Sequence, residues 1–155
     1  MATSLLPVIG KPAPDFTLPS TTGENISLRQ FKGKKTVILY FYPKDETPGC
    51  TREACDFRDH SADFEATGTI VLGVSTDSLE SHQHFKDKNH LPFPLLADVD
   101  QKVCHTYDVL GLFGANTRRV TYAVGRNGRI AGVAKATLRM QTHDALLRRV
   151  LARRA

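Results

Sequence analysis

The sequence has no apolar run approaching the roughly 20 residues that a helix needs to cross a bilayer. Its first ten residues lack the basic region of a signal peptide, and Pro7 interrupts the apolar stretch there, so we expect no cleaved signal. No internal repeat, low-complexity tract or linker divides the 155 residues. This length allows a substantial core, and we expect one domain over residues 1–155.

Cysteine is scarce, with only Cys50, Cys55 and Cys104 in the chain. So small and odd a number argues against a secreted disulfide scaffold and favours a reducing cytoplasm. In that compartment, two cysteines five positions apart indicate redox catalysis or metal binding. The sequence also lacks a Cys-x-x-Cys motif, which disfavours a general dithiol oxidoreductase.

Aromatic residues are not interleaved with the basic ones, as they are where nucleic-acid bases stack. The formal net charge is +5. Much of the excess lies in residues 148–154, where cations also favour the C-terminus of a helix. We therefore expect no nucleic-acid partner and no membrane partner.

Strands and helices are predicted to alternate along the chain. Two unbroken runs of apolar and β-branched residues, typical of strands covered on both faces, span residues 36–42 and 69–75. Shorter strands are predicted at 16–18, 26–28, 95–97, 120–124 and 130–134. Helices are predicted at 50–67, from Asp77 or Ser78 to about 89, within 98–109, and at 142–153.

The order of these elements predicts an α/β protein with a thioredoxin-like fold. Its central mixed β-sheet is flanked by helices. The two short strands at 16–18 and 26–28 form an N-terminal β-hairpin extension. The last two strands form a second hairpin, because Asn127-Gly128 is a strong turn signal between apolar runs.

Cys50 stands where a buried strand, a proline-rich loop and a helix follow one another. A helix that begins at Cys50 places the sulfur among free backbone N–H groups, at the positive end of the helix dipole. Both favour the thiolate, the form that attacks an O–O bond. The alternative is a small buried apolar residue, but a Pro-Gly-Cys helix start offers no apolar wall.

The residues around Cys50 resemble the active-site loop of the peroxiredoxins. Pro43, Thr47 and Cys50 have the spacing of that family's proline, threonine and cysteine. Residues 47–51, 54–55 and 57–59 are similar to the bacterioferritin-comigratory-protein, or peroxiredoxin Q, subfamily. Further similar segments lie at 10–18, 75–77, 81–85 and 91–98, so the resemblance extends over nearly the whole chain.

The resemblance implies a thiol-dependent peroxidase that reduces hydrogen peroxide and organic hydroperoxides in antioxidant defence. Cys50 is then the peroxidatic cysteine and Cys55 the resolving cysteine, and thioredoxin or a similar dithiol protein is the reductant. A late arginine of the family corresponds to Arg119, whose guanidinium can stabilise the thiolate and the leaving oxygen. Arg118 is better suited to a solvated strand edge. The chemistry needs no cofactor and no metal, and a monomer is expected.

The spacing of the two cysteines makes a structural demand. In an intact helix their Cα atoms lie roughly 8.7 Å apart. A disulfide needs less than about 7 Å. The first turns of the helix must therefore unwind before the bridge closes.

Two other readings use the same residues. Cys50, Cys55, Cys104 and His105 could bind zinc, but their spacing makes a poor tetrahedral set. A catalytically inactive, chaperone-like protein is disfavoured because the expected active-site positions are all occupied.

Three residues outside the motif are predicted to have no catalytic role. Cys104 is interpreted as core packing, with an alternative resolving thiol as the second reading. His82 and His84 are interpreted as solvated residues of a polar helix.

Overall fold

The structure is a computed structural model that describes residues 7–111 and 117–135. In chain order its strands are β1 (Thr17–Pro19), β2 (Asn25–Ser27), β3 (Thr36–Phe41), β4 (Thr69–Ser75), β5 (Leu95–Ala97), β6 (Val120–Val124) and β7 (Ile130–Lys135). Its helices are the 3-10 helix η1 (Leu28–Phe31) and α1 (Pro48–Asp59), α2 (Ser61–Ala66), α3 (Leu79–Asn89) and α4 (Lys102–Thr106).

The central sheet has five strands in the order β5-β4-β3-β6-β7. Strands β3, β4 and β5 run parallel, whereas β6 is antiparallel to β3 and β7 is antiparallel to β6. The hairpin β1–β2 forms a separate two-stranded sheet. A mixed sheet with an N-terminal hairpin is the arrangement that the sequence predicts.

Strand β3 is buried along its whole length because its side chains fill two cores. Val37, Leu39 and Phe41 pack on one face of the sheet, and Ile38 and Tyr40 pack on the other. Apolar residues therefore follow one another from Val37 to Phe41, which explains the absence of alternation in the sequence.

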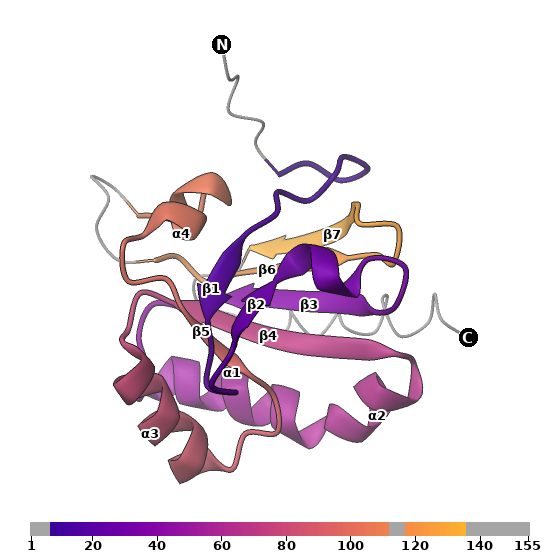
Figure 1. The fold of residues 1–155 in the computed structure, drawn as a ribbon. Coiled ribbons are helices and arrows are strands. Elements are labelled where there is room, and N and C mark those ends of the chain that lie inside the picture. Colours follow the sequence, from indigo (N-terminus) through magenta and orange to yellow (C-terminus); the bar gives the residue numbers. More distant parts are fainter. Residues whose placement is uncertain (1–6, 112–116, 136–155) are drawn as a thin grey trace.

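Different elements cover the two faces of the sheet (Figure 1). Helices α1, α2 and α3 cover one face with Phe57, Phe64 and Phe85. The hairpin β1–β2, η1 and α4 cover the other face. Buried side chains there include Leu18 and Cys104.

Several predicted boundaries are wrong by a few residues. The helix expected at 50–67 begins at Pro48 and is broken at His60 into α1 and α2. Ser78 is the N-cap of α3, and its side chain accepts a hydrogen bond from the backbone N of Ser81 at 3.1 Å. The predicted turn between β6 and β7 is present, with Gly128 at a φ of 79°. The helix predicted at 142–153 lies outside the described residues.

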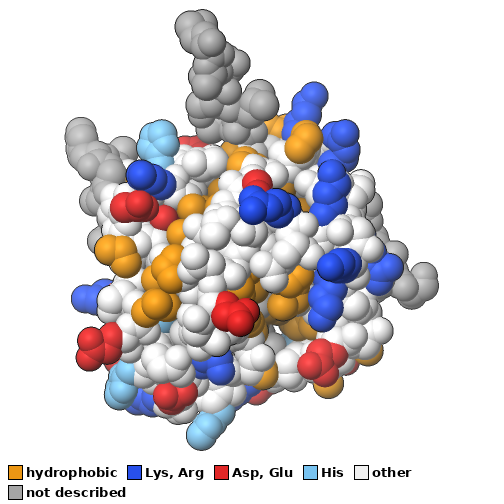
Figure 2. Space-filling model, viewed as in Figure 1, with side chains coloured by type: hydrophobic (Ala, Val, Ile, Leu, Met, Phe, Trp, Pro, Cys, Tyr) orange, Lys and Arg blue, Asp and Glu red, His pale blue; other side chains and the backbone are white. Residues whose placement is uncertain are grey.

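Basic side chains gather along one edge of the face in Figure 2, near the β6–β7 turn of Figure 1. The arginines of residues 148–154, which contribute much of the positive charge, lie outside the described residues. In the part of the chain that the structure describes, every helix is too short or too polar to cross a membrane.

Candidate active site

Cys50 lies in the first turn of α1, just beyond the carboxyl end of β3. Thr47 is the N-cap residue, with φ −74° and ψ 150°, and Pro48 opens the helix, where its missing N–H costs no hydrogen bond. The hydroxyl of Thr47 does not cap the helix but donates to the carbonyl oxygen of Lys44 at 3.0 Å. Cys50 is the third helical residue, so its sulfur lies at the positive end of the helix dipole. The expectation that this helix start offers no apolar wall is wrong, because Cys50 is buried against the core side chains of this face of the sheet.

Arg119 approaches the sulfur from the residue immediately before β6. Its Nη2 lies 3.6 Å from the Sγ of Cys50. Its Nη1 donates to the Oε1 of Glu53 at 2.8 Å and to the carbonyl oxygen of Gly49 at 3.4 Å. One guanidinium thus joins the sulfur to two other positions on α1, and its charge favours a thiolate beside it.

The neighbouring arginine has a different environment. Arg118 donates to the carbonyl oxygen of Asp108 at 2.6 Å and is partly exposed. Arg119 is therefore the arginine whose guanidinium reaches Cys50.

Gly49 permits this close approach. A Cβ built on Gly49 would lie 2.8 Å from the Nη2 of Arg119. That distance is shorter than a van der Waals contact, so any side chain at this position displaces the guanidinium. The glycine of the Thr-Pro-Gly-Cys segment thus leaves the guanidinium room to lie where it does.

Glu53 is a buried member of the site that sequence reasoning missed. Its side chain is inaccessible to solvent and forms an ion pair with Arg119. Burial raises the pKa of Glu53 to about 7, against the opposing effect of the Arg119 charge. Its spacing of three from Cys50 on a helix is a weak signal that could have pointed to it, because such residues share a face.

Cys55 is half-buried on the same intact helix as Cys50. Its Sγ lies 4.0 Å from the Oδ1 of Asn89, the last residue of α3. All three cysteines are free thiols in this structure. Arg58 joins the second half of α1 to the end of α3, because its Nη1 donates to the carbonyl oxygen of Asn89 at 2.7 Å.

Cys104 lies in the core on the opposite face of the sheet from Cys50. Burial raises the pKa of its thiol well above the ordinary value, and Asp98 acts in the same direction. Such a thiol stays neutral and unreactive.

The structure does not bring the proposed zinc ligands together. Among the residues it describes, the metal-ligating groups whose atoms lie within 4.8 Å of one another are Asp45, Asp77 and His82. Hydrogen bonds already join these three residues to one another and to their neighbours.

The interpretation of His82 as a solvated residue is wrong, whereas His84 is exposed as expected. The side chain of His82 is completely buried and pairs with Asp45. Its position three residues before the buried Phe85 places both on the inner face of α3. That periodicity was the available signal.

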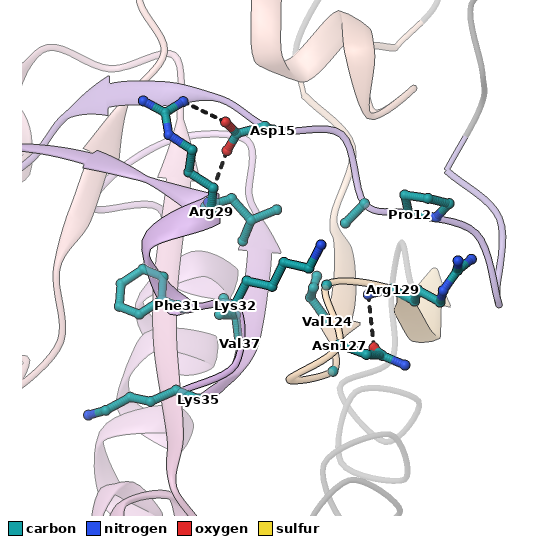
Figure 3. Close-up of a pocket in the computed structure, with 14 residues that line it drawn as sticks. Pro12, Asp15, Arg29, Phe31, Lys32, Lys35, Val37, Val124, Asn127 and Arg129 are labelled. Atoms are coloured by element: carbon teal, nitrogen blue, oxygen red, sulfur yellow. Dashed lines mark hydrogen bonds and ion pairs between the residues drawn. The ribbon is translucent and has the colours of Figure 1, made fainter.

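A separate hollow of about 210 Å³ lies at the other end of β3 (Figure 3). Apolar residues such as Leu28 and Val37 line it, and Arg29 at its rim is paired with Asp15 at 2.7 Å. None of the candidate catalytic residues lines this hollow. It plays no part in the chemistry below.

The fold and the site together define a class of protein. The sheet has the thioredoxin-like arrangement. It delivers a buried cysteine to the start of a helix and holds a guanidinium beside the sulfur. A thiol placed in this way can act as a nucleophile, and the guanidinium beside it can stabilise an oxyanion. This is the chemistry of a thiol peroxidase.

The comparison with known proteins names the family. The model of the AhpC/TSA family matches residues 9–133, and the chain belongs to that family. It is 50% identical over 131 residues to a putative peroxiredoxin bcp of Coxiella burnetii, covering 81% of this chain and 86% of that protein. It is 45% identical over 128 residues to Peroxiredoxin Bcp of Bacillus subtilis, covering 79% and 81%.

Solved structures agree with the sequence relatives. The bacterioferritin comigratory protein of Xanthomonas campestris, described for its alkyl peroxide reduction activity, has a TM-score of 0.85 at 31% identity. The match covers 96% of this chain and all of that one. Peroxidoxin BcpB of Mycobacterium tuberculosis has a TM-score of 0.86 at 30% identity, covering 94% and 97%. The chain is thus a peroxiredoxin of the bacterioferritin-comigratory-protein and peroxiredoxin Q subfamily, and a thiol-dependent peroxidase.

Proposed function

We propose that Cys50 is the peroxidatic cysteine of this peroxidase and that Cys55 resolves it. The observation that carries the proposal is the 3.6 Å approach of the Arg119 guanidinium to the Cys50 sulfur in the first turn of α1. The helix dipole and the guanidinium both favour the thiolate there.

In the first step, the Cys50 thiolate attacks the terminal oxygen of the hydroperoxide. The O–O bond breaks, a sulfenic acid forms on Cys50, and the departing oxyanion takes a proton and leaves as water or an alcohol. Arg119 is placed to stabilise the charge that develops on that oxygen. Thr47 and Pro43 shape the loop along which the peroxide enters. The Thr47 hydroxyl donates its hydrogen to Lys44, so its oxygen is suited to accept a hydrogen bond from the hydroperoxide O–H.

In the second step, Cys55 condenses with the sulfenic acid. The Cys55 sulfur bonds to the Cys50 sulfur, and the hydroxyl leaves with the Cys55 proton as water. Because both residues lie on the intact helix α1, roughly 8.7 Å apart by helix geometry, the first turns must unwind.

The cycle closes when a dithiol protein reduces the Cys50–Cys55 bridge by thiol–disulfide exchange. Thioredoxin is the proposed reductant, and hydrogen peroxide and alkyl hydroperoxides are the proposed substrates. The relative from Xanthomonas campestris supports the alkyl class. We further propose that the chain works as a cytoplasmic monomer with residues 1–155 forming one domain, since the pair lies within one helix and no second chain is needed.

Turnover of peroxide by thioredoxin and its reductase tests this scheme with three single variants. Cys50→Ser should abolish peroxide reduction. Cys55→Ser should reduce one equivalent of peroxide and then stop. Cys104→Ser should behave like wild type. If Cys104→Ser loses recycling while Cys55→Ser retains it, the assignment of the resolving thiol is wrong.

A further inference from the structure

Asp45 belongs to the loop before α1 and is buried, with hydrogen bonds to four other residues. Its buried carboxylate accepts hydrogen bonds from the Tyr42 hydroxyl at 2.6 Å, the Ser81 hydroxyl at 2.8 Å and the Nδ1 of His82 at 2.7 Å. Its backbone N donates to the Oδ2 of Asp77 at 2.8 Å. A single loop residue is thus joined to the end of β3, the end of β4 and the start of α3.

The partner His82 is held at both ring nitrogens. Its Nδ1 faces the Asp45 carboxylate, and its Nε2 lies 2.9 Å from the carbonyl oxygen of Leu96 in β5. An oxygen atom faces the ring on each side, so these two contacts fix its orientation. The 2.7 Å contact with the Asp45 carboxylate is short and directional.

A buried polar pair of this kind needs a reason other than stability. Replacing a buried carboxylate and its partner by apolar side chains is often neutral or stabilising, because the polar groups have lost their hydration. What the pair provides is a fixed geometry. It holds the loop at one position relative to α3 and β5.

The loop that is held in this way carries the peroxide-binding residues. Asp45 precedes Thr47 by two positions and Cys50 by five. Between them, Glu46 has a φ of 64°, which an L-residue with a side chain seldom adopts. The loop keeps this backbone because it is fixed on both sides, by the buried contacts of Asp45 and by the bond from the Thr47 hydroxyl to Lys44.

In the part of the chain that the structure describes, the groups hydrogen-bonded to Asp45 and His82 lie outside α1. They come from Tyr42 just after β3, from the turn after β4, from α3 and from β5. The proposed cycle requires α1 to unwind and rewind at every turnover. A loop anchored to the sheet and α3 does not follow that motion.

We propose that Asp45 and His82 are positioning residues of the peroxidase. They hold the 43–47 loop in its peroxide-binding geometry while α1 unwinds and reforms. The inference rests on the proposed roles of Thr47 and Cys50, and it adds a rigid element to a site whose helix must be mobile.

Two reactions of the same sulfur test this inference. Reaction of reduced protein with hydrogen peroxide depends on the loop, whereas alkylation of Cys50 by iodoacetamide depends on the thiolate and on its accessibility, and needs no peroxide-binding group. Cys55→Ser, Cys104→Ser protein leaves one reactive thiol for both measurements. In this background, Asp45→Asn should lower the peroxide rate constant by about tenfold or more, because small misplacements of binding groups are costly. The alkylation rate should stay within about twofold, since Arg119 and the helix dipole are unchanged.

Gln83→Ala is the matched control on α3, because Gln83 is the exposed neighbour of His82 and its side chain bonds Asp87, away from the loop. It should leave both rates at the wild-type level, whereas His82→Gln should behave like Asp45→Asn. Ser81→Ala removes one hydrogen bond to Asp45 without changing charge. This milder variant tests the inference even if Asp45→Asn and His82→Gln do not fold. It should lower the peroxide rate by about threefold, the effect of losing one net hydrogen bond.

A parallel fall of both rates in the folded variants, or no fall of the peroxide rate in Ser81→Ala and Asp45→Asn, overturns the inference. Failure of the proposed function looks different. In that case the parent protein itself reacts with peroxide no faster than free cysteine does.

Discussion

The guanidinium of Arg119 bridges the Glu53 carboxylate, 2.8 Å from its Nη1, and the Cys50 sulfur, 3.6 Å from its Nη2. Glu53 and Cys50 thus contact the same cation in a largely buried place. Because Glu53 titrates near neutral pH, the share of the positive charge that Arg119 offers to the sulfur depends on pH.

The pH dependence of the peroxide reaction should therefore contain the titration of Glu53. The pKa of Glu53 is raised to about 7 by burial, so the residue is neutral below this pH and ionised above it. Glu53→Gln cannot titrate, and its rate profile should lack the inflection near pH 7 that the parent shows. Stopped-flow measurement of the peroxide rate constant from pH 5 to 9 gives both profiles. Identical profile shapes for the two proteins would show that Glu53 does not affect the reaction.

The same group should make stability depend on pH. Glu53 binds its proton more tightly in the folded state, where its pKa is about 7, than in the unfolded chain, where it is near 4.5. The resulting stabilisation is complete below pH 4.5 and is lost as pH rises through 7. From pH 4.5 to 8, wild type should lose on the order of 3 kcal/mol of unfolding free energy relative to Glu53→Gln, at 1.36 kcal/mol per pKa unit. Urea unfolding of both proteins at the two pH values provides the comparison.

Much of this fold could be predicted, because its signals are local. The apolar runs of β3 and β4 and the Asn127-Gly128 turn can each be recognised from a few consecutive residues. Cys50 at a helix start is equally local, since Pro48 and Gly49 precede it. The break at His60 could not be foreseen, because apolar residues continue across it at helical spacing.

The electrostatics of the site could not be predicted from the sequence. Arg119 and Glu53 are 66 positions apart, and Asp45 and His82 are 37 apart. No residue near His82 in the sequence indicates that both of its ring nitrogens lie within hydrogen-bond distance of oxygen atoms. Such pairs form only when the sheet brings the ends of β3, β4 and β5 to one edge.

Arg119→Lys should slow the peroxide reaction by at least about tenfold. A lysine ammonium cannot reach Cys50, Glu53 and Gly49 at once as the planar guanidinium does. Arg118→Lys is the matched control because its contacts are with Asp108, away from the sulfur, and it should stay within about twofold of wild type. Equal losses in the two variants would contradict the assignment.

Gly49→Ala should act through Arg119. The new methyl group would lie 2.8 Å from the Nη2 of Arg119 and push the guanidinium from the sulfur. We expect a loss of about three- to tenfold in the peroxide rate, because charge stabilisation falls with distance. A double-mutant cycle decides the mechanism: with Arg119→Lys already present, Gly49→Ala should have little further effect. Additive losses would mean that the methyl group acts elsewhere.

Arg58→Ala should speed disulfide formation. The bond from Arg58 to the carbonyl oxygen of Asn89 ties the second half of α1 to α3, and its loss makes unwinding easier. The sulfenic acid should resolve about two- to fivefold faster, as expected for losing one hydrogen bond. The variant should also resist overoxidation by excess peroxide. Arg52→Ala, an exposed arginine on the same helix, should match wild type. Slower resolution in Arg58→Ala would mean that the tie guides the motion.

The identity of the oxidised sulfur tests the central claim most directly. One equivalent of hydrogen peroxide is added to reduced Cys55→Ser protein, the sulfenic acid is trapped with dimedone, and the adduct is located by mass spectrometry. The adduct should lie on Cys50 alone, with Cys104 unmodified in its buried place. An adduct on Cys104, or undiminished peroxide consumption by Cys50→Ser protein, would contradict the account.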